Sequence, residues 1–287
     1  MKRGKRILIL FLAFVLAFQV PVTSYGATKS AKAKASAKAA AKMAKLQKKV
    51  KSYIKKSCPA SPNGSKSNTC WSVYVKDLKT NKSFTINKNA FFSASTIKLY
   101  AMATAYDQAK KKKLNMTPSV ESQIRSMISV SSNDAFNSLV YGRLGAGTIN
   151  KFCKKNKFKR TQQYTRCGSG NSAEASGSSK ANMTSAADCG KLLEMICRGR
   201  LVSKSASKKM LNHLKAQTIR TKIPQGVPSG ITVANKTGES GSIENDTAIV
   251  YGKKTKYILC VFSNTTNPAQ ARNCIRQISR MVYAALN

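Results

Sequence analysis

Segments typical of β-strands lie near the two ends of the predicted domain, and the long stretch between them is typical of helices. Alternating side chains predict strands at 71–78 and 83–86, joined by a short turn, and at 231–236, 246–251 and 257–263. Apolar spacing predicts helices after Ser95, from Thr117-Pro118, and over 134–143, 148–155, 185–198, 204–215 and 268–285. We therefore expect an α+β fold. One antiparallel sheet, formed by N- and C-terminal strands, packs against helices and carries an inserted all-helical subdomain.

Residues 1–26 are typical of a secretory signal peptide, with four basic residues before an apolar run at 7–18 and small residues Ser24 and Gly26 at the predicted cleavage site. The apolar run is shorter than the roughly 20 residues that span a bilayer, so no stable membrane span is expected after cleavage. We expect a secreted protein that is extracellular or associated with the cell wall.

The chain carries a formal net charge of +41, and residues 27–41 form an Ala/Lys-rich basic tail or linker without an acidic residue. A helical stripe of Met43, Leu46, Val50 and Ile54 follows, and we expect the folded domain to span 42–287. Such a basic surface would suit an anionic cell-wall polymer or lipid headgroups. The alternative is that the charge has no binding partner and only keeps the protein soluble. Nucleic acid is not the favoured partner of an exported protein, and we expect a monomer.

Eight cysteines fit an oxidising compartment. The sequence has no Cys-x-x-Cys pair and a single histidine, so neither a metal site nor a cofactor is expected. Disulfide pairs Cys58–Cys70 and, less strongly supported, Cys153–Cys167 are predicted. Cys189 and Cys197 stand two turns apart on one predicted helix, which is too far for a mutual disulfide.

Ser95 and Lys98 stand three residues apart where a helical pattern begins, so their side chains should share one face. A serine hydroxyl becomes a good nucleophile when a neighbouring base takes its proton. The only histidine, His213, is expected to be a packed or surface residue, so lysine is the candidate base. The Ser-x-x-Lys pattern alone is weak evidence, because Ser52–Lys55 and Ser205–Lys208 also match it.

Two further motifs follow in order: Ser131-Ser132-Asn133 and Lys236-Thr237-Gly238. Each has an ordinary alternative, since Asn133 could cap a helix, Lys236 could be a surface lysine and Thr237 could serve a strand. The order S-x-x-K, S-x-N, K-T-G resembles that of the class A β-lactamases and penicillin-binding D,D-peptidases. The resemblance extends over nearly all of residues 42–286 and implies a serine hydrolase of that fold.

By this resemblance Ser95 is the nucleophile, and Lys98 is its general base, with a pKa lowered by the positive charge of Lys236. Ser131 would pass a proton to the leaving nitrogen, and Asn133 would hold the acyl-side amide of the substrate.

The resemblance also implies that Lys236 and Thr237 bind the substrate carboxylate, while Gly238 lets its strand pass close to the ligand. The backbone N–H groups of Ser95 and Glu239 would form an oxyanion hole. Arg220 either helps to hold the carboxylate or forms a structural ion pair. Asn137 is expected to tie backbone segments together.

One departure from the family pattern concerns deacylation. Class A β-lactamases carry a loop glutamate that activates the deacylating water, and this position falls on Cys167 if Asn171 is aligned with the asparagine of that loop. The nearby acid, Glu174, has the wrong spacing. The expected substrates are β-lactams, acyl-D-Ala-D-Ala stem peptides of peptidoglycan, or both. A β-lactamase, a D,D-carboxypeptidase with slow β-lactam deacylation, a non-catalytic wall-binding module and a basic nucleic-acid binder remain as alternatives.

Overall fold

The computed structural model describes residues 23–64, 69–168 and 180–287, with side chains from Ser30 onward. The signal-peptide prediction concerns residues that lie mostly outside these ranges, and Asn171 and Glu174 also lie outside them. The chain divides into two compact units, Met1–Lys38 and Ala39–Asn287. In the first unit, the described residues 23–38 are helical and belong to helix α1 (Thr23–Ser57). No helix among the described residues is long and apolar enough to cross a membrane.

The second unit is built around a five-stranded sheet with the order β2-β1-β7-β6-β5. Every neighbouring pair is antiparallel. The strands are β1 (Trp71–Asp77), β2 (Ser83–Ile86), β5 (Val233–Ser240), β6 (Ile243–Tyr251) and β7 (Lys256–Ser263). Strand β7 therefore joins N-terminal to C-terminal strands, as the sequence predicts.

Strand β7 is buried on both faces because it lies between two hydrophobic cores. Ile258, Cys260 and Phe262 belong to the core shared with the helical subdomain. The alternate residues Tyr257, Leu259 and Val261 belong to the core shared with α8 (Pro268–Leu286) and the part of α1 after Lys38. The stripe on α1 that the sequence predicts, Met43, Leu46, Val50 and Ile54, is buried in this second core.

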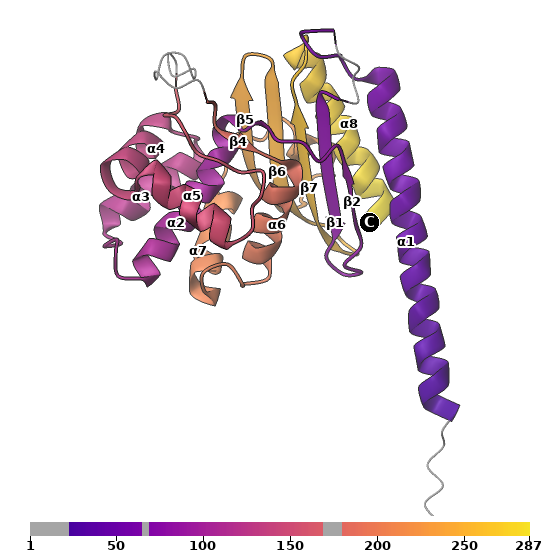
Figure 1. Cartoon of the computed structure of the whole chain (residues 1–287). Helices are drawn as coiled ribbons and strands as arrows, with labels where there is room; N and C mark the ends of the chain where they lie inside the picture. The colour runs from indigo at the N-terminus through magenta and orange to yellow at the C-terminus, as the bar shows by residue number, and fades with distance from the viewer. Residues whose placement is uncertain (1–22, 65–68, 169–179) are drawn as a thin grey trace, which may run out of the picture. The chain divides into compact units, whose positions relative to one another are not determined.

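The helical subdomain covers the other face of the sheet and lies between β2 and β5 in the chain (Figure 1). Its helices are α2 (Lys98–Lys110), α3 (Pro118–Ser129), α4 (Asn133–Leu139), a π-helical turn (Val140–Leu144), α5 (Ala146–Lys155), α6 (Ala186–Cys197) and α7 (Lys204–Lys215). Side chains of Thr117, Ser132, Ser185 and Ser203 accept hydrogen bonds from the first turns of four of these helices. These caps satisfy N–H groups that a helix leaves unpaired.

Two short segments link the subdomain to the sheet. Strands β3 (Phe91–Phe92) and β4 (Met183–Thr184) pair with each other, and a 3-10 turn (Ala94–Ile97) leads from β3 into α2. A second 3-10 turn (Ile223–Gly226) packs against α8 before β5. The first turn carries Ser95, so the sheet edge and the helices meet at this residue.

The predicted disulfides are absent, and these predictions are wrong for this structure. The thiol of Cys58 contacts that of Cys274 on α8 instead of pairing with Cys70. Cys153 is buried beside Asp188 and Cys189, whereas Cys167 lies near Lys98 and Lys236. Sequence spacing favours local pairs, but here α8 brings a distant cysteine to the end of α1.

Candidate active site

The Ser95 turn is fixed by strained and closely packed backbone. Ala94 has a φ of 43°, a conformation that non-glycine residues rarely adopt outside special sites. The side-chain amide of Asn245 on β6 donates to the carbonyls of Phe92 (3.0 Å) and Ser93 (3.2 Å). Strand β6 thereby holds the chain immediately before the candidate nucleophile.

Strand β5 passes directly against this turn. A side chain on Gly238 would lie 2.9 Å from the Ser93 carbonyl and 3.2 Å from the Ser95 nitrogen, so only glycine fits without displacing backbone. The close approach seen here is to the Ser95 turn, and the passage of this strand close to a ligand stays a prediction. This close approach brings strand β5 against the backbone of the Ser95 turn.

The Lys98 amine lies at the centre of the site. Its Nζ is 3.0 Å from Ser95 Oγ, 2.7 Å from the Ser131 carbonyl and 2.6 Å from Asn133 Oδ1. The side chain is completely buried. Ser95 itself is half-buried. Ser132, not Asn133, caps α4, so the amide of Asn133 is available to the site.

Burial lowers the pKa of Lys98 to about 8, and the nearby Cys167 thiol opposes the shift. The charge of Lys236 is not the main cause, and that part of our expectation is wrong. The main cause is desolvation, which raises the free energy of the charged ammonium form of Lys98. At pH near 8 a substantial fraction of Lys98 is therefore neutral and can accept the proton of Ser95.

Ser131 connects the two lysines. Its Oγ lies 3.4 Å from Nζ of Lys98 and 2.8 Å from Nζ of Lys236. Its own φ of 61° is a second strained backbone conformation. This turn aims both the hydroxyl and the carbonyl of Ser131 at Lys98. A hydroxyl between two amines can pass a proton from one side of the site to the other.

Lys236 is fully buried, and its Nζ also donates to the Thr237 carbonyl at 2.8 Å. Burial lowers its pKa well below the ordinary value, the charge of Lys98 lowers it further, and Asp246 opposes the shift. Thr237 is buried on the same strand. A negatively charged ligand group beside Lys236 would compensate for this desolvation.

Arg220 stands outside this group of contacts. Its Nη1 donates to the Val233 carbonyl at 3.3 Å, where β5 begins. The proposed structural ion pair is not formed among the described residues. The structure therefore gives Arg220 a backbone contact, and its role toward a substrate carboxylate stays a prediction.

Cys167 occupies the edge of the site. Asn137 brackets its backbone, because Oδ1 accepts from the Cys167 N–H (3.0 Å) and Nδ2 donates to the Cys167 carbonyl (2.8 Å). This is the backbone role expected for Asn137. Burial raises the pKa of the Cys167 thiol to about 11, and the charges of Lys98 and Lys236 oppose that shift. The group at this position is therefore a neutral thiol at pH 7.

The sequence analysis missed an ion network that joins the end of β5 to β6 and α8. Nζ of Lys222 lies 2.9 Å from Glu239 Oε1 and 2.6 Å from Glu244 Oε2, and Arg272 on α8 also pairs with Glu244. Lys222 is fully buried. No short sequence motif predicts such a network, because its members come from three separate segments of the chain. It anchors the strand pair that carries Gly238 and Glu239.

His213 takes part in the packing of the helical subdomain, as expected. Its Nε2 lies 3.0 Å from the hydroxyl of Tyr106, which also donates to Glu121. Burial lowers the pKa of His213. No group of three or more potential metal-ligating side chains occurs within the described ranges.

The model of the beta-lactamase enzyme family matches residues 45–123 and 115–286. This chain belongs to the beta-lactamase enzyme family. It has the α+β fold shared by class A β-lactamases and related penicillin-binding proteins. A comparison with curated protein sequences returns no match.

Solved structures share the fold at low sequence identity. PBP-A superimposes with a TM-score of 0.71 and 20% identity, over 84% of this chain and 95% of that one. The β-lactamase from Sphaerobacter thermophilus DSM 20745 gives 0.68 and 19%, over 75% and 91% of the two chains. An acyl-enzyme complex of a PBP-A variant with penicillin G gives 0.70 and 22%, over 85% and 96%.

Proposed function

We propose that this beta-lactamase-family protein is an active-site-serine amide hydrolase that is acylated at Ser95 by β-lactams, by acyl-D-Ala-D-Ala peptides, or by both. The observation that carries the proposal is the Lys98 amine, 3.0 Å from Ser95 Oγ, buried and with a pKa lowered to about 8. A neutral amine at this distance can remove the hydroxyl proton as the oxygen attacks.

The reaction follows from the positions of the neighbouring groups. Ser95 Oγ attacks the amide carbonyl, and the N–H groups of Ser95 and Glu239 would stabilise the oxyanion. The C–N bond then breaks, and the Ser131 hydroxyl supplies a proton to the leaving nitrogen. Lys236 and Thr237 hold the ligand carboxylate, and Asn133 holds the acyl-side amide.

Deacylation is expected to be slow for β-lactams, as in a penicillin-binding D,D-peptidase. A water molecule needs a general base to attack the acyl ester, and a carboxylate serves this purpose in class A β-lactamases. Cys167 presents a neutral thiol instead, with its backbone held by Asn137. A thiol with a pKa of about 11 is a poor proton acceptor at neutral pH.

Intact-protein mass spectrometry with penicillin G tests both acylation at Ser95 and slow deacylation. Ring opening loses no atoms, so acylation adds the whole mass of penicillin G to the protein. We expect one adduct that persists for hours and is absent from Ser95→Ala. An adduct that vanishes within seconds would identify a β-lactamase. A protein that never forms an adduct would be a non-catalytic module, such as a wall-binding one.

We also propose that the protein is exported and that the basic segment at residues 27–40 retains it on anionic wall polymers. The segment contains four lysines and no acid. Retention of this kind weakens as salt screens the charges. Deleting residues 27–40 should lower the salt concentration that elutes the protein from isolated anionic wall material. An unchanged elution position would overturn this proposal.

A further inference from the structure

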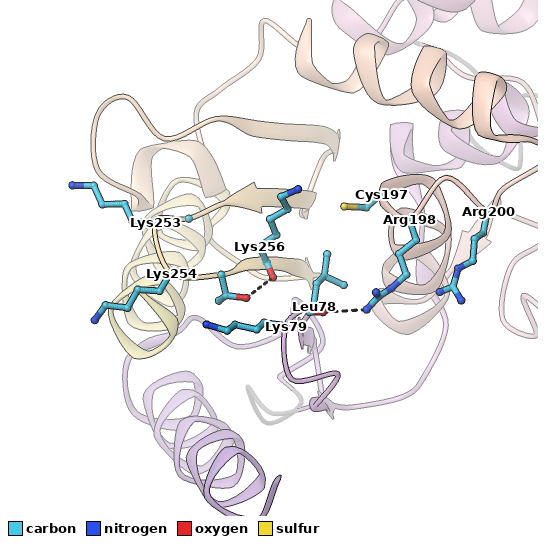
Figure 2. A pocket seen from close by; sticks show the side chains of 10 residues that line it. Leu78, Lys79, Cys197, Arg198, Arg200, Lys253, Lys254 and Lys256 are labelled. Atoms are coloured by element: carbon cyan, nitrogen blue, oxygen red, sulfur yellow. Dashed lines mark hydrogen bonds between the residues drawn. The ribbon is translucent and has the colours of Figure 1, made fainter. Parts of the chain in front are cut away.

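A basic hollow of about 780 Å³ opens at the opposite end of the sheet from the Ser95 turn. Three segments form it: the β1–β2 turn, the chain following α6 and the β6–β7 turn. Six cationic side chains surround it, and none of its lining residues is acidic: Lys79, Arg198, Arg200, Lys253, Lys254 and Lys256. In Figure 2 the two arginines enter from one side and the lysines of the β6–β7 turn lie on the other.

The side-chain carboxylates of Asp77 and Glu194, which lie beside the hollow, are already engaged. Asp77 accepts hydrogen bonds from the Lys79 N–H, the Thr80 hydroxyl and the Thr255 hydroxyl. Glu194 pairs with Lys76 at 2.7 Å and with Arg198 at 2.8 Å, and lies 3.6 Å from Arg200.

Lys79, Lys253 and Lys254 form no ion pair with another described residue. Like charges gathered around one hollow repel each other and attract an anion.

The walls of the hollow are held in place before any ligand arrives. Asn287 Oδ1 accepts from the N–H groups of Lys254 (2.8 Å) and Thr255 (3.0 Å), which fixes the β6–β7 turn. The Asp77 carboxylate joins this turn to the β1–β2 turn, and Arg198 Nη2 donates to the Leu78 carbonyl at 3.3 Å. A preformed cationic site loses less conformational entropy on binding than lysines on mobile loops do.

The hollow is separate from the candidate active site. Lys236 on β5 is opposite Thr247 on β6, whereas the hollow begins after Tyr251, where β6 ends. Five residues of strand from Thr247 to Gly252 correspond to about 17 Å. Binding at the hollow therefore adds a function that the hydrolase chemistry does not use.

We propose that this hollow binds a linear polyanion whose charges are phosphodiesters and which carries no nucleobases. The exposed guanidinium of Arg200 can offer phosphate oxygens a planar pair of donors, and the lysines add point charges along the chain. Single-stranded nucleic acids are bound through bases that stack on aromatic side chains, and no aromatic residue lines the hollow. The chemistry of the lining therefore favours a phosphate polymer without bases.

The test uses the full chain and a synthetic glycerol phosphodiester oligomer, with binding measured by calorimetry at several salt concentrations. The test variant is Lys79→Gln/Arg200→Gln/Lys253→Gln/Lys254→Gln. The matched control removes four charges from exposed lysines on other elements: Lys88→Gln/Lys112→Gln/Lys159→Gln/Lys208→Gln. Both variants have the same net charge, so the comparison separates a local site from the general basicity of the chain.

We expect the test variant to lose at least about tenfold in affinity and the control less than about threefold. Losing four phosphate contacts should also reduce the slope of log K against log salt by roughly 3. Equal losses in both variants would overturn the proposal, because bulk charge would then explain the binding. Tighter binding of oligo-dT that depends on the same four residues would also overturn it, in favour of nucleic acid.

Both variants should retain wild-type melting temperatures and wild-type rates of acylation by penicillin G. Failure of polyanion binding is therefore distinguishable from failure of the proposed hydrolase activity.

Discussion

The two ends of the five-stranded sheet use lysine in opposite ways. Beside the Ser95 turn, Lys98 and Lys236 are fully buried, and burial lowers the pKa of both. Near the end of β6, Lys253 and Lys254 are exposed beside the basic hollow. The same side chain is thus suited to proton transfer at one end and to attracting anions at the other. The surroundings of the lysine amine therefore decide whether it serves proton transfer or attracts anions.

A third arrangement lies between these extremes. Lys222 is as buried as Lys98, but it contacts the carboxylates of Glu239 and Glu244. Two carboxylate contacts make Lys222 an anchor between neighbouring segments of the chain. The difference between Lys98 and Lys222 is therefore the presence of carboxylates, and four experiments test this comparison.

The largest effect is expected for Lys98→Ala. Loss of the general base should slow acylation by penicillin G about 10³-fold, within the range that such catalysis contributes. The measurement is the rate of adduct formation by mass spectrometry. Lys55→Ala is the matched control, because Ser52–Lys55 has the same spacing without the site. A Lys98→Ala protein that reacts at the wild-type rate would show that another group takes the proton.

The next effect concerns stability. Lys222→Met removes the partner of two carboxylates, of which Glu244 keeps Arg272, and should lower the free energy of unfolding by about 2–4 kcal/mol. Lys209→Met breaks a more exposed bridge to Glu121 and should cost less than about 1 kcal/mol. Urea titration of both variants gives the comparison. Equal losses of unfolding free energy in the two variants would mean that burial adds nothing to the Lys222 network.

Cys167→Glu adds a carboxylate beside the two buried lysines. It should speed deacylation of the penicilloyl ester about 10²-fold by supplying a general base. Glutamine is similar in size to glutamate but uncharged, so the adduct should persist in Cys167→Gln. Adduct lifetime by mass spectrometry distinguishes the variants, and equal lifetimes would count against position 167 as the missing base.

The smallest effect is expected in the pH profile of acylation. Since the pKa of Lys98 is lowered to about 8, the neutral base is depleted below this pH. The rate should fall about tenfold for each pH unit below 8 and level off above it. Cys167→Glu should move the midpoint upward, because a nearby negative charge favours the ammonium form. A flat profile between pH 6 and 8 would contradict Lys98 as the base.

Sequence patterns predict the five strands of the main sheet and most helices, but not the short strands β3 and β4, because period, capping residues and short motifs are local properties. The group formed by Ser95, Lys98, Ser131, Asn133 and Lys236 follows from motif order. The partner of Cys58, the network around Lys222 and the main cause of the Lys98 pKa shift are not predicted. Each depends on tertiary packing, which brings residues such as Cys274 and Glu244 to positions that spacing does not reveal.

The register between β1 and β7, with Trp71 opposite Ser263, has a consequence for folding during synthesis. A ribosome must have made nearly the whole domain before the central strand exists, so the sheet cannot assemble during most of translation. Contacts this far apart in the chain also make folding slow. The nascent polypeptide therefore cannot complete its central sheet until translation of the domain is nearly finished.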